Sequence, residues 1–336
     1  MMMAAVVAPV PGGPESLVTA EVVAPVPGAG EVLIEVAAAG VNRADIMQRE
    51  GAYDPPPGAS PVLGLECSGV VVDLGPEVDA EWMGREVCAL LPGGGYAELV
   101  TAPVELVLPV PEGVSLVDAA GLVETAATVW SNMIDRGGLA AGDVVLVHGG
   151  ASGIGSVAIQ LARAWGADVV ATAGSEAKVD HCLRIGASIA IDHSSEAFEA
   201  VLAAKGRAVD VVVDVVGGPY LERNLNVLRR GGRLVLIGLL GGARTEVDLT
   251  PFLLKDLTLT GSGLRTQPLA AKARIIRGLR DEVWPLYESG VLRPTTDAVV
   301  PLRHASIAHT VLESGAARGK VVLAVSSSVL TTTEAS

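Results

Sequence analysis

The clearest chemical signal in the sequence is a glycine-rich turn that follows an apolar run. The segment His148–Gly155 contains four glycines, and it comes directly after the β-branched run Asp143–Val147. Glycines let a backbone approach a pyrophosphate closely, and the free N–H groups of the next helix, expected over Ser156–Trp165, face the anion. The match to the dinucleotide motif G-x-G-x-x-G is imperfect, because Ser152 replaces the middle glycine. The turn predicts a dinucleotide site; the alternative is a tight turn that binds no nucleotide.

The end of the second expected strand, Gly166–Thr172, distinguishes between two dinucleotides. In an NAD site an Asp or Glu about twenty residues beyond the glycines binds the ribose 2′-hydroxyl. Here Gly174 and Ser175 leave room for a 2′-phosphate, and Lys178 offers it a positive charge. We therefore predict NADPH as the cofactor. Two alternatives stay open, since Glu176 could be the acid of an NAD site and Lys178 could be a solvated helix residue.

The composition is that of a globular protein with room for two domains. The chain has 336 residues, of which half are apolar and only 3% aromatic. No apolar run reaches the roughly 18 residues of a membrane span, and no secretory signal is visible at the N-terminus, so we expect a cytoplasmic protein. The three scattered cysteines favour buried apolar roles over disulfides. A net charge of −14 argues against nucleic-acid and membrane partners.

The first part of the chain, to about residue 122, predicts a compact antiparallel β-domain. Apolar runs at Glu31–Val36, Cys67–Val72 and Glu86–Leu91 are typical of strands, and turn residues separate them. A short polar helix is expected within Gly40–Gly51. It is followed by the rigid loop Tyr53–Gly58, which contains three consecutive prolines.

From Asp143 the pattern alternates between strands and helices, which predicts an α/β fold with a doubly wound parallel sheet. A helix over Leu116–Trp130 precedes the sheet. Its further strands are expected at Ala187–Ile191, Asp210–Asp214, Gly232–Ile237 and Leu257–Gly261, with helices at Glu176–Ile185 and Ser195–Ala204.

The C-terminal part is expected to return to the first domain. A helix over Leu269–Ser289 carries a basic side, interpreted as a solvated face. Strands at Thr295–Val300 and Lys320–Val325 then rejoin the β-domain, because the nucleotide sheet is already full. The predicted domains are 1–122 with 267–325 and 123–266, and residues 326–336 are expected to be a disordered tail. The basic side comprises Lys272, Arg274, Arg277 and Arg280.

The order of these motifs resembles the medium-chain dehydrogenase/reductase superfamily, and within it the zinc-independent quinone oxidoreductases. The resemblance rests on Gly64-Leu65-Glu66, Gly94–Glu98 and His148–Gly155 in that order. The segments Asn42–Gly51, Tyr53–Gly58, Leu91–Gly95 and Thr172–Ser175 with Lys178 are similar to the stress-inducible quinone oxidoreductase subgroup. The family implies a β-rich GroES-like catalytic domain beside the Rossmann domain.

The resemblance also implies that no zinc site is present. Where zinc alcohol dehydrogenases carry their ligands, this chain has Asn42, Leu65 and Glu124. Without thiolate or imidazole at these places a tetrahedral zinc site cannot form. Glu66 and Glu124 could still hold a hard cation, but hydrogen bonding, with Arg43 as a partner, is the favoured role.

A substrate reduced without a Lewis acid must already be electrophilic, as a quinone or an α,β-unsaturated carbonyl is. The candidate catalytic residues are Asn42 and Tyr53, which lie in the segment that lines the cleft in relatives. We expect them to orient nicotinamide or substrate rather than to act as obligatory acids. The alternatives are that Asn42 caps the following helix and that Tyr53 packs its loop.

The remaining cofactor contacts are implied by the resemblance. The glycine-rich turn is expected at the pyrophosphate, the end of the second strand at the adenosine phosphate, and His193 beside the adenine ribose, unless it is an exposed loop residue. The later strand ends are expected at the ribose and nicotinamide. In chain order the predicted residues are Ser152, Gly153, Ile154, Gly155, Gly174, Ser175, Lys178, His193, Gly218, Gly238, Leu239, Leu240, Gly263, Leu264 and Arg265. His148, His181, His304 and His309 are not expected to be catalytic, the last three being interpreted as surface residues.

These inferences predict a two-domain NADPH-dependent reductase of a small-molecule quinone or enone. An enoyl-thioester reductase of the same superfamily is the alternative enzyme, and a non-catalytic NADPH-binding protein is the alternative outside enzymes. The edge strand Leu257–Gly261 is expected to pair across a two-fold axis, as it does in relatives, which predicts a homodimer.

Overall fold

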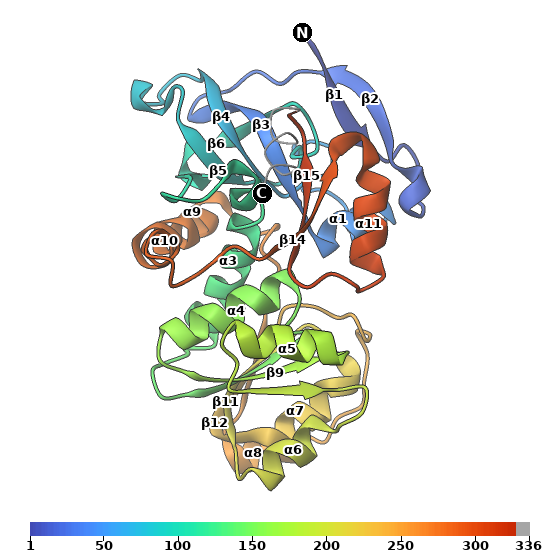
Figure 1. Ribbon diagram of the computed structural model, residues 1–336, viewed down its shortest axis with the longest axis vertical. Coiled ribbons are helices and arrows are strands. Elements are labelled where there is room, and N and C mark those ends of the chain that lie inside the picture. Colours follow the sequence, from blue (N-terminus) through green and yellow to red (C-terminus); the bar gives the residue numbers. More distant parts are fainter. Residues whose placement is uncertain (327–336) are drawn as a thin grey trace. The chain divides into compact units, whose positions relative to one another are not determined.

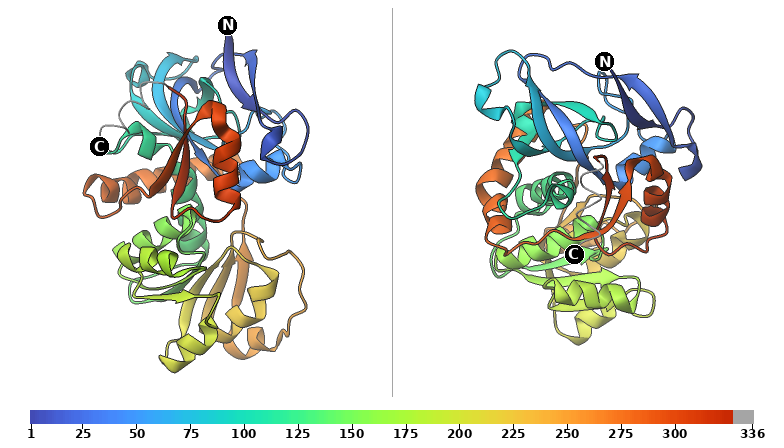
Figure 2. Two further views of the ribbon diagram at one scale, coloured as in Figure 1. Left: turned by 45° about the vertical axis from the view of Figure 1, so that its right-hand side comes forward. Right: turned by 45° about the horizontal axis from the view of Figure 1, so that its top comes forward.

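A computed structural model describes residues 1–326 of the chain. It divides into two compact units, which we call the β-rich unit (1–125 and the chain from 265 onward) and the parallel-sheet unit (126–264). The tail that the sequence predicts to be disordered lies outside the described residues, apart from Ser326. Each unit is described by itself (Figures 1 and 2).

The parallel-sheet unit contains the doubly wound sheet that the alternating pattern predicts. Its six strands are all parallel and run in the order β10-β9-β8-β11-β12-β13. The order reverses between β8 and β11, which is the place where open α/β sheets bind their ligands. The strands are β8 (Val144–His148), β9 (Asp168–Ala173), β10 (Ile189–Asp192), β11 (Val209–Asp214), β12 (Leu228–Leu236) and β13 (Thr258–Gly261).

Helices cover both faces of this sheet, as the crossover connections require. Figure 1 shows α4 (Gly153–Ala164) and α5 (Glu176–Arg184) on one side, and α6 (Phe198–Ala204), α7 (Leu221–Val227) and α8 (Thr250–Lys255) on the other. The second group closes an apolar core in which side chains of α6 and α7 pack on β8, β9, β11 and β12. The short turn η5 (Gly218–Tyr220) precedes α7, and the π-helical segment η4 (Trp130–Arg136) precedes β8.

The β-rich unit is built on a seven-stranded sheet with the order β14-β15-β3-β4-β5-β7, in which β6 also pairs with β3. A separate hairpin, β1 (Met2–Val7) with β2 (Val18–Val23), lies at the N-terminus. The sheet strands are β3 (Glu31–Val41), β4 (Glu66–Leu74), β5 (Glu86–Leu90), β6 (Leu99–Pro103), β7 (Val107–Pro109), β14 (Thr296–Pro301) and β15 (Lys320–Ala324). The short 3-10 turns of the unit are η1 (Pro14–Ser16), η2 (Ala80–Trp82), η3 (Val104–Leu106) and η7 (Leu302–His304).

The C-terminal strands rejoin this sheet as the sequence predicts, because β15 pairs antiparallel with β3. The expected purely antiparallel arrangement is wrong at one place, since β14 and β15 are parallel. Parallel neighbours need a crossover, and the crossover here is α11 (Ala305–Glu313), a helix that the sequence analysis did not predict. Figure 2 shows α11 beside β14 and β15.

Two expected helices are interrupted. The segment Leu116–Trp130 forms α2 (Leu116–Ala119) and α3 (Val123–Val129) with a break between them. At the break a Cβ on Gly121 would lie 2.5 Å from the Lys320 side chain, so this close approach requires a glycine. The C-terminal helix consists of α9 (Leu269–Gly278), the π-helical turn η6 (Leu279–Val283) and α10 (Trp284–Glu288).

Burial corrects three expectations about polar side chains. Lys272, expected on a solvated face of α9, is buried, and so are His181 and His309, expected at the surface. A 3.6-residue period does not show that a lysine stem lies against apolar neighbours or that a histidine has a buried hydrogen-bond partner. The three cysteines are buried and free, as expected. No helix within residues 1–326 is long and apolar enough to span a membrane.

Candidate functional site

The carboxyl ends of the six parallel strands carry the predicted cofactor residues. Each strand from β8 to β13 is followed by one predicted group, so sequence segments far apart along the chain meet at one edge of the sheet. Arg265 is the exception, because its side chain belongs to the β-rich unit and is described below. The groups are Ser152–Gly155 after β8, Gly174–Lys178 after β9, His193 after β10, Gly218 after β11, Gly238–Leu240 after β12, and Gly263 with Leu264 after β13.

The turn between β8 and α4 presents backbone N–H groups at the point where the strand order reverses. Ser152 is the N-cap of α4, and its Oγ accepts a hydrogen bond from Gly155 N at 3.0 Å. This cap starts the helix at Gly153, three residues before the expected start. A Cβ on Gly155 would lie 2.3 Å from the carbonyl oxygen of Gly149, so the helix packs against the turn itself. The helix N-terminus and tight turn suit a phosphate group.

The end of β9 places the residues that would distinguish NADPH from NADH. Ser175 is exposed and is the N-cap of α5, and Lys178 lies in the first turn of that helix. A Cβ on Gly174 would lie 3.2 Å from Nε2 of His193, so His193 lies directly beside this strand end. Glu176 is also exposed at the start of α5. The geometry thus brings together Ser175, Lys178 and His193, and keeps Glu176 close to them.

The ends of β11 and β12 are locked together by their backbones. Leu240 N donates to the carbonyl oxygen of Val215 at 3.0 Å, and Gly241 N donates to that of Val216 at 2.8 Å. Gly217 has a φ of +82°, a conformation that other residues rarely adopt. Next to this backbone lie Leu239 and Leu240, which are 51% and 62% exposed. They offer an apolar surface beside a rigid polar turn.

His148 supports this edge of the sheet from within the core. Asn224 Nδ2 donates to Asp214 at 3.0 Å, so Asn224 Oδ1 must accept from His148 Nε2 at 2.8 Å. His148 Nδ1 then accepts from the Thr172 hydroxyl at 2.9 Å. Burial lowers the pKa of His148 to about 4, which keeps the ring neutral. His148 is therefore a structural histidine.

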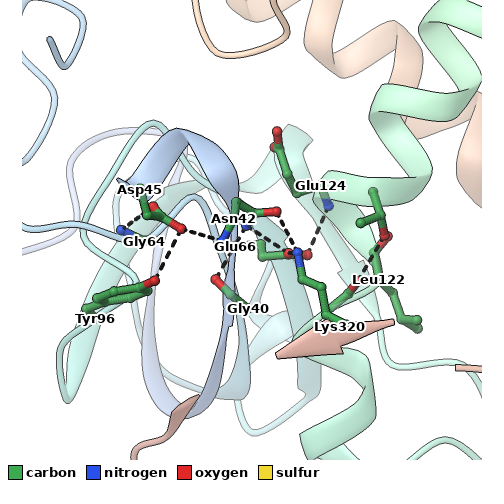
Figure 3. A network of polar contacts seen from close by, with 11 residues as sticks. Gly40, Asn42, Asp45, Gly64, Glu66, Tyr96, Leu122, Glu124 and Lys320 are labelled. Atoms are coloured by element: carbon green, nitrogen blue, oxygen red, sulfur yellow. Dashed lines mark hydrogen bonds and ion pairs between the residues drawn. The ribbon is translucent and has the colours of Figure 1, made fainter. Parts of the chain in front are cut away.

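The predicted catalytic residue Asn42 lies in a buried polar network of the β-rich unit (Figure 3). It precedes α1 (Arg43–Arg49), and its side chain donates to Glu66 Oε1 at 3.0 Å and to the Gly40 carbonyl oxygen at 3.4 Å. Lys320 Nζ lies 2.5 Å from both Asn42 Oδ1 and Glu66 Oε1. Glu66 and Lys320 are almost fully buried. The expectation that Arg43 is the partner of Glu66 is wrong. The partner is Lys320, and Arg43 is exposed.

Glu124, which was expected to form hydrogen bonds with Arg43 as a partner, instead contacts Glu66 through its backbone. Its N–H donates to Glu66 Oε2 at 3.0 Å, and in Figure 3 its carboxyl group points away from Lys320. Burial and then the charge of Glu66 raise the pKa of Glu124 to about 8. Glu124 therefore carries a proton at neutral pH.

A second buried hydrogen-bond network, which we call the Asp45 relay, was missed by the sequence analysis. The Asp45 carboxylate accepts hydrogen bonds from the backbone of Asn42 and Gly64, and Tyr96 OH lies 3.2 Å from both Asp45 and His309 Nε2. Burial raises the pKa of Asp45 to about 6 and lowers that of His309 to about 4. This relay fixes the start of α1, which is the element that positions Asn42.

The relay reaches the edge of the unit through an arginine. The guanidinium of Arg49 lies 3.4 Å from His309 Nδ1 and forms a bidentate pair with Glu313 on α11 at 3.1 and 2.6 Å. No local sequence pattern joins residues on α1, on α11 and in the loop between β5 and β6 that carries Tyr96. Contacts between residues so far apart along the chain cannot be recognised from a single sequence.

The predicted catalytic residue Tyr53 lies beside Arg265. The Arg265 guanidinium carbon is 5.3 Å from the centre of the Tyr53 ring. Arg265 Nε donates to the carbonyl oxygen of Pro92 at 2.8 Å, and Nη2 donates to Gln48 Oε1 at 2.7 Å. Burial raises the pKa of Tyr53, and the charge of Glu124 adds to this while Arg265 opposes it. The structure thus joins Tyr53 to Arg265, whereas Asn42 belongs to the Lys320 network.

Within residues 1–326, no group of three or more His, Cys, Asp and Glu side chains is placed to hold a metal ion. At the three positions compared with zinc enzymes stand Asn42, whose oxygen is bound by Lys320, the buried Leu65, and the protonated Glu124.

Two family models match this chain. Residues 28–112 match the alcohol dehydrogenase GroES-like domain, and residues 153–276 match the zinc-binding dehydrogenase family. The first lies in the β-rich unit and most of the second in the parallel-sheet unit. The fold class predicted from the sequence is therefore confirmed.

Similar proteins include both long synthases and enzymes of the same length. The chain is 33% identical over 86% of its length to a mycocerosic acid synthase-like polyketide synthase of Mycobacterium tuberculosis, of which it spans only 14%. It is 31% identical to a 2-haloacrylate reductase of Burkholderia sp, covering 96% of this chain and 99% of that protein. It is 30% identical to quinone oxidoreductase of Sus scrofa, covering 93% and 94%.

Solved structures agree with these matches. Escherichia coli quinone oxidoreductase complexed with NADPH is 29% identical with a TM-score of 0.84, covering 96% of this chain and 99% of that one. A mycobacterial protein complexed with NADPH is 30% identical with a TM-score of 0.85, covering 97% and 100%. The resemblance inferred from the motifs is confirmed: the chain belongs to the medium-chain dehydrogenase/reductase superfamily and is a homologue of its quinone oxidoreductases.

Proposed function

We propose that this chain is an NADPH-dependent reductase of quinones or other conjugated carbonyls and needs no metal. The observation that carries the proposal is the position of Lys320, whose ammonium is bound between Asn42 and Glu66 at 2.5 Å from each. With a fixed ammonium there and a protonated Glu124 beside it, the substrate has to accept hydride without a Lewis acid. A quinone or enone does so, because the incoming charge delocalises onto its conjugated oxygen.

The strand ends of the parallel-sheet unit fit the proposed cofactor. NADPH, when bound, supplies the hydride. The N-terminus of α4 with Ser152 would hold the pyrophosphate, and Ser175 with Lys178 would hold the 2′-phosphate. The similar proteins solved with NADPH support this choice over NADH.

The two candidate catalytic residues would have different roles. Both N–H groups of the Asn42 amide are directed at Gly40 and Glu66, so Asn42 would position its segment rather than donate to the substrate. The Tyr53 hydroxyl makes no hydrogen bond within residues 1–326 and is the available donor to a substrate oxygen. Burial keeps Tyr53 protonated, since its pKa is raised.

An enoyl-thioester reductase is the second candidate. The match to part of a polyketide synthase favours it, because that match covers 86% of this chain. Both candidate reactions use NADPH and a conjugated carbonyl that accepts hydride without a metal. They differ only in the group attached to that carbonyl.

A homodimer is proposed from the edge of the parallel sheet. Among the strands within residues 1–326, β13 pairs only with β12. Exposed leucines lie on β13 and on α8, which precedes it: Leu259 is 40% exposed and Leu253 83%. An apolar edge strand of this kind favours pairing with a second copy. Light scattering should report a dimer, and a monomer would contradict the proposal.

The experiment that tests the function is NADPH oxidation by the purified protein with a panel of acceptors. The panel contains ortho-quinones, para-quinones, simple enones and a crotonyl thioester, with NADH run in parallel. We expect the highest kcat/KM with quinones and NADPH. A preference for the thioester would favour the second candidate, and a preference for NADH would show that Glu176 rather than Lys178 determines the cofactor.

A further inference from the structure

Arg265 is a buried cation with an unused hydrogen-bond donor. Its side chain is only 4% exposed, and Nη1 has no hydrogen-bond partner among residues 1–326 although it is shielded from solvent. The other donors are used by neutral groups, Nε by the Pro92 carbonyl and Nη2 by the Gln48 amide. Buried guanidinium groups are normally paired, because leaving such a donor unsatisfied is costly. The orphaned Nη1 therefore points to a missing anionic or polar partner.

The acids that act on Arg265 through their charge do not contact it directly. No carboxylate within residues 1–326 forms an ion pair with Arg265, and Lys272, also buried, directs its Nζ at the Arg265 carbonyl oxygen at 3.4 Å. Burial, above all, lowers the pKa of Lys272; the charge of Glu124 opposes this and the charge of Arg265 adds to it. Asp45 and Glu124 act on Arg265 only through their charges, and the pKa of Glu124 is itself raised to about 8. Two buried cations thus lie together in a protein whose net charge is −14.

We propose that Arg265 binds the carboxylate of an acidic substrate, so that the enzyme acts on conjugated carbonyl compounds that carry a carboxyl group. This assignment rests on the proposed reductase function and replaces the cofactor role that the sequence analysis gave to Arg265. Nη1 and the second N–H of Nη2 form the planar fork that matches two carboxylate oxygens.

Tyr53 adds a hydrogen-bond donor to the proposed carboxylate site. Its ring packs against the guanidinium at 5.3 Å, which holds the fork in place, and its hydroxyl is a free donor. A substrate anchored by its carboxylate at Arg265 would place its conjugated carbonyl within reach of Tyr53. The specificity would come from charge, because the neutral analogue would leave the Arg265 donors unpaired.

Binding of a simple acid tests this site without turnover. The probe is benzoate, with benzamide as the neutral analogue of the same shape, titrated calorimetrically into the full chain. We expect benzoate to bind at least about tenfold more tightly than benzamide, and Arg265→Gln to remove that difference. Arg277→Met, an exposed arginine on α9, is the matched control and should bind as the wild type does. Equal benzoate affinity in wild type and Arg265→Gln would overturn the proposal.

Kinetics and cofactor binding separate this inference from its alternatives. For a quinone with a carboxymethyl arm and its methyl ester, the ratio of kcat/KM values should fall about tenfold or more in Arg265→Gln. Arg265→Lys, which keeps the charge but not the fork, should retain part of the preference and guards against a misfolded glutamine variant. If Arg265→Gln weakens NADPH binding but leaves benzoate binding unchanged, Arg265 serves the cofactor and the proposal is wrong. Benzoate binding through Arg265 without reduction of any acceptor would support the anion site and refute the proposed reductase.

Discussion

The candidate sites of the two units consist of different kinds of chemical groups. The edge of the parallel sheet is made of backbone: glycine turns, helix N-termini and interlocked loops, with the neutral His148 behind them. The β-rich unit uses buried ionisable side chains, namely the Glu66–Lys320 pair, Asp45, Glu124 and Arg265. The first kind of site binds the same ligand in many proteins, whereas the second can be changed by single substitutions. We infer that cofactor binding is the general property of this chain and that its substrate choice lies in the β-rich unit.

Breaking the buried ion pair should have the largest effect. Lys320→Met leaves Glu66 uncompensated in the core, and we expect a loss of about 3–5 kcal/mol in the free energy of unfolding. Chemical denaturation measures it. Arg318→Met, an exposed neighbour, is the control and should change stability by less than about 0.5 kcal/mol. If the double variant Lys320→Met/Glu66→Gln is no more stable than Lys320→Met, the loss does not come from the unpaired carboxylate.

A glycine in the nucleotide turn should come next. In Gly155→Ala the new methyl group would lie 2.3 Å from a backbone oxygen and 2.6 Å from the Cα of Gly150, so the turn must shift. We expect a cost of about 1–3 kcal/mol in stability and weaker NADPH binding. Fluorescence titration of NADPH measures the second effect. Gly28→Ala, whose methyl group would meet only the Glu31 carboxylate at 3.3 Å, should leave NADPH affinity as it is.

Removing the Tyr53 hydroxyl should have a moderate effect on turnover. If Tyr53 orients the substrate and water supplies the proton, Tyr53→Phe should lower kcat by about tenfold. Steady-state kinetics with a para-quinone measures it. A fall of more than about a hundredfold would mean that Tyr53 acts as an obligatory acid.

The smallest effect is a pH dependence in the β-rich unit. The pKa of Glu124 rises to about 8 in the folded state from an ordinary value of 4.5, so between these values the native protein holds a proton that the unfolded chain has lost. Stability due to this group therefore falls as pH rises from about 4.5 to 8. Glu124→Gln should raise stability at pH 8 and leave it nearly unchanged at pH 4.5. Thermal melts at the two pH values decide, and an equal gain at both would contradict this origin.

The same contrast explains what the sequence could predict. The backbone site is local: Ser152 and its partner Gly155 are three positions apart, and a strand, a glycine turn and a helix follow one another in one segment. The six strands could therefore be located from periodicity and turn chemistry, whereas most of the predicted cofactor residues at their ends rest on the resemblance to the family and stay predictions. The close approach at Gly121 could not be located, because the side chain that would meet a Cβ there, Lys320, lies on a distant strand.

The side-chain site depends on partners that no local pattern connects. Asn42 and Lys320 are 278 positions apart, and Arg265 and Gln48 are 217 apart. Asn42 and Tyr53 could be chosen by their resemblance to the family, but Arg43, the expected partner of Glu66, was wrong for this reason, since the partner Lys320 lies on a distant strand. His309 was likewise expected at the surface, since only the fold brings Tyr96 and Arg49 to it.

The most direct test of the central claim is the effect of metal removal on turnover. The protein is dialysed against a strong chelator, its metal content is determined, and NADPH oxidation with a para-quinone is measured before and after. Because Lys320 occupies the place between Asn42 and Glu66, the account predicts unchanged kcat and no gain when Zn²⁺ is added back. Loss of activity on dialysis with recovery on Zn²⁺ addition would show that the substrate is activated by a metal, and would contradict the account.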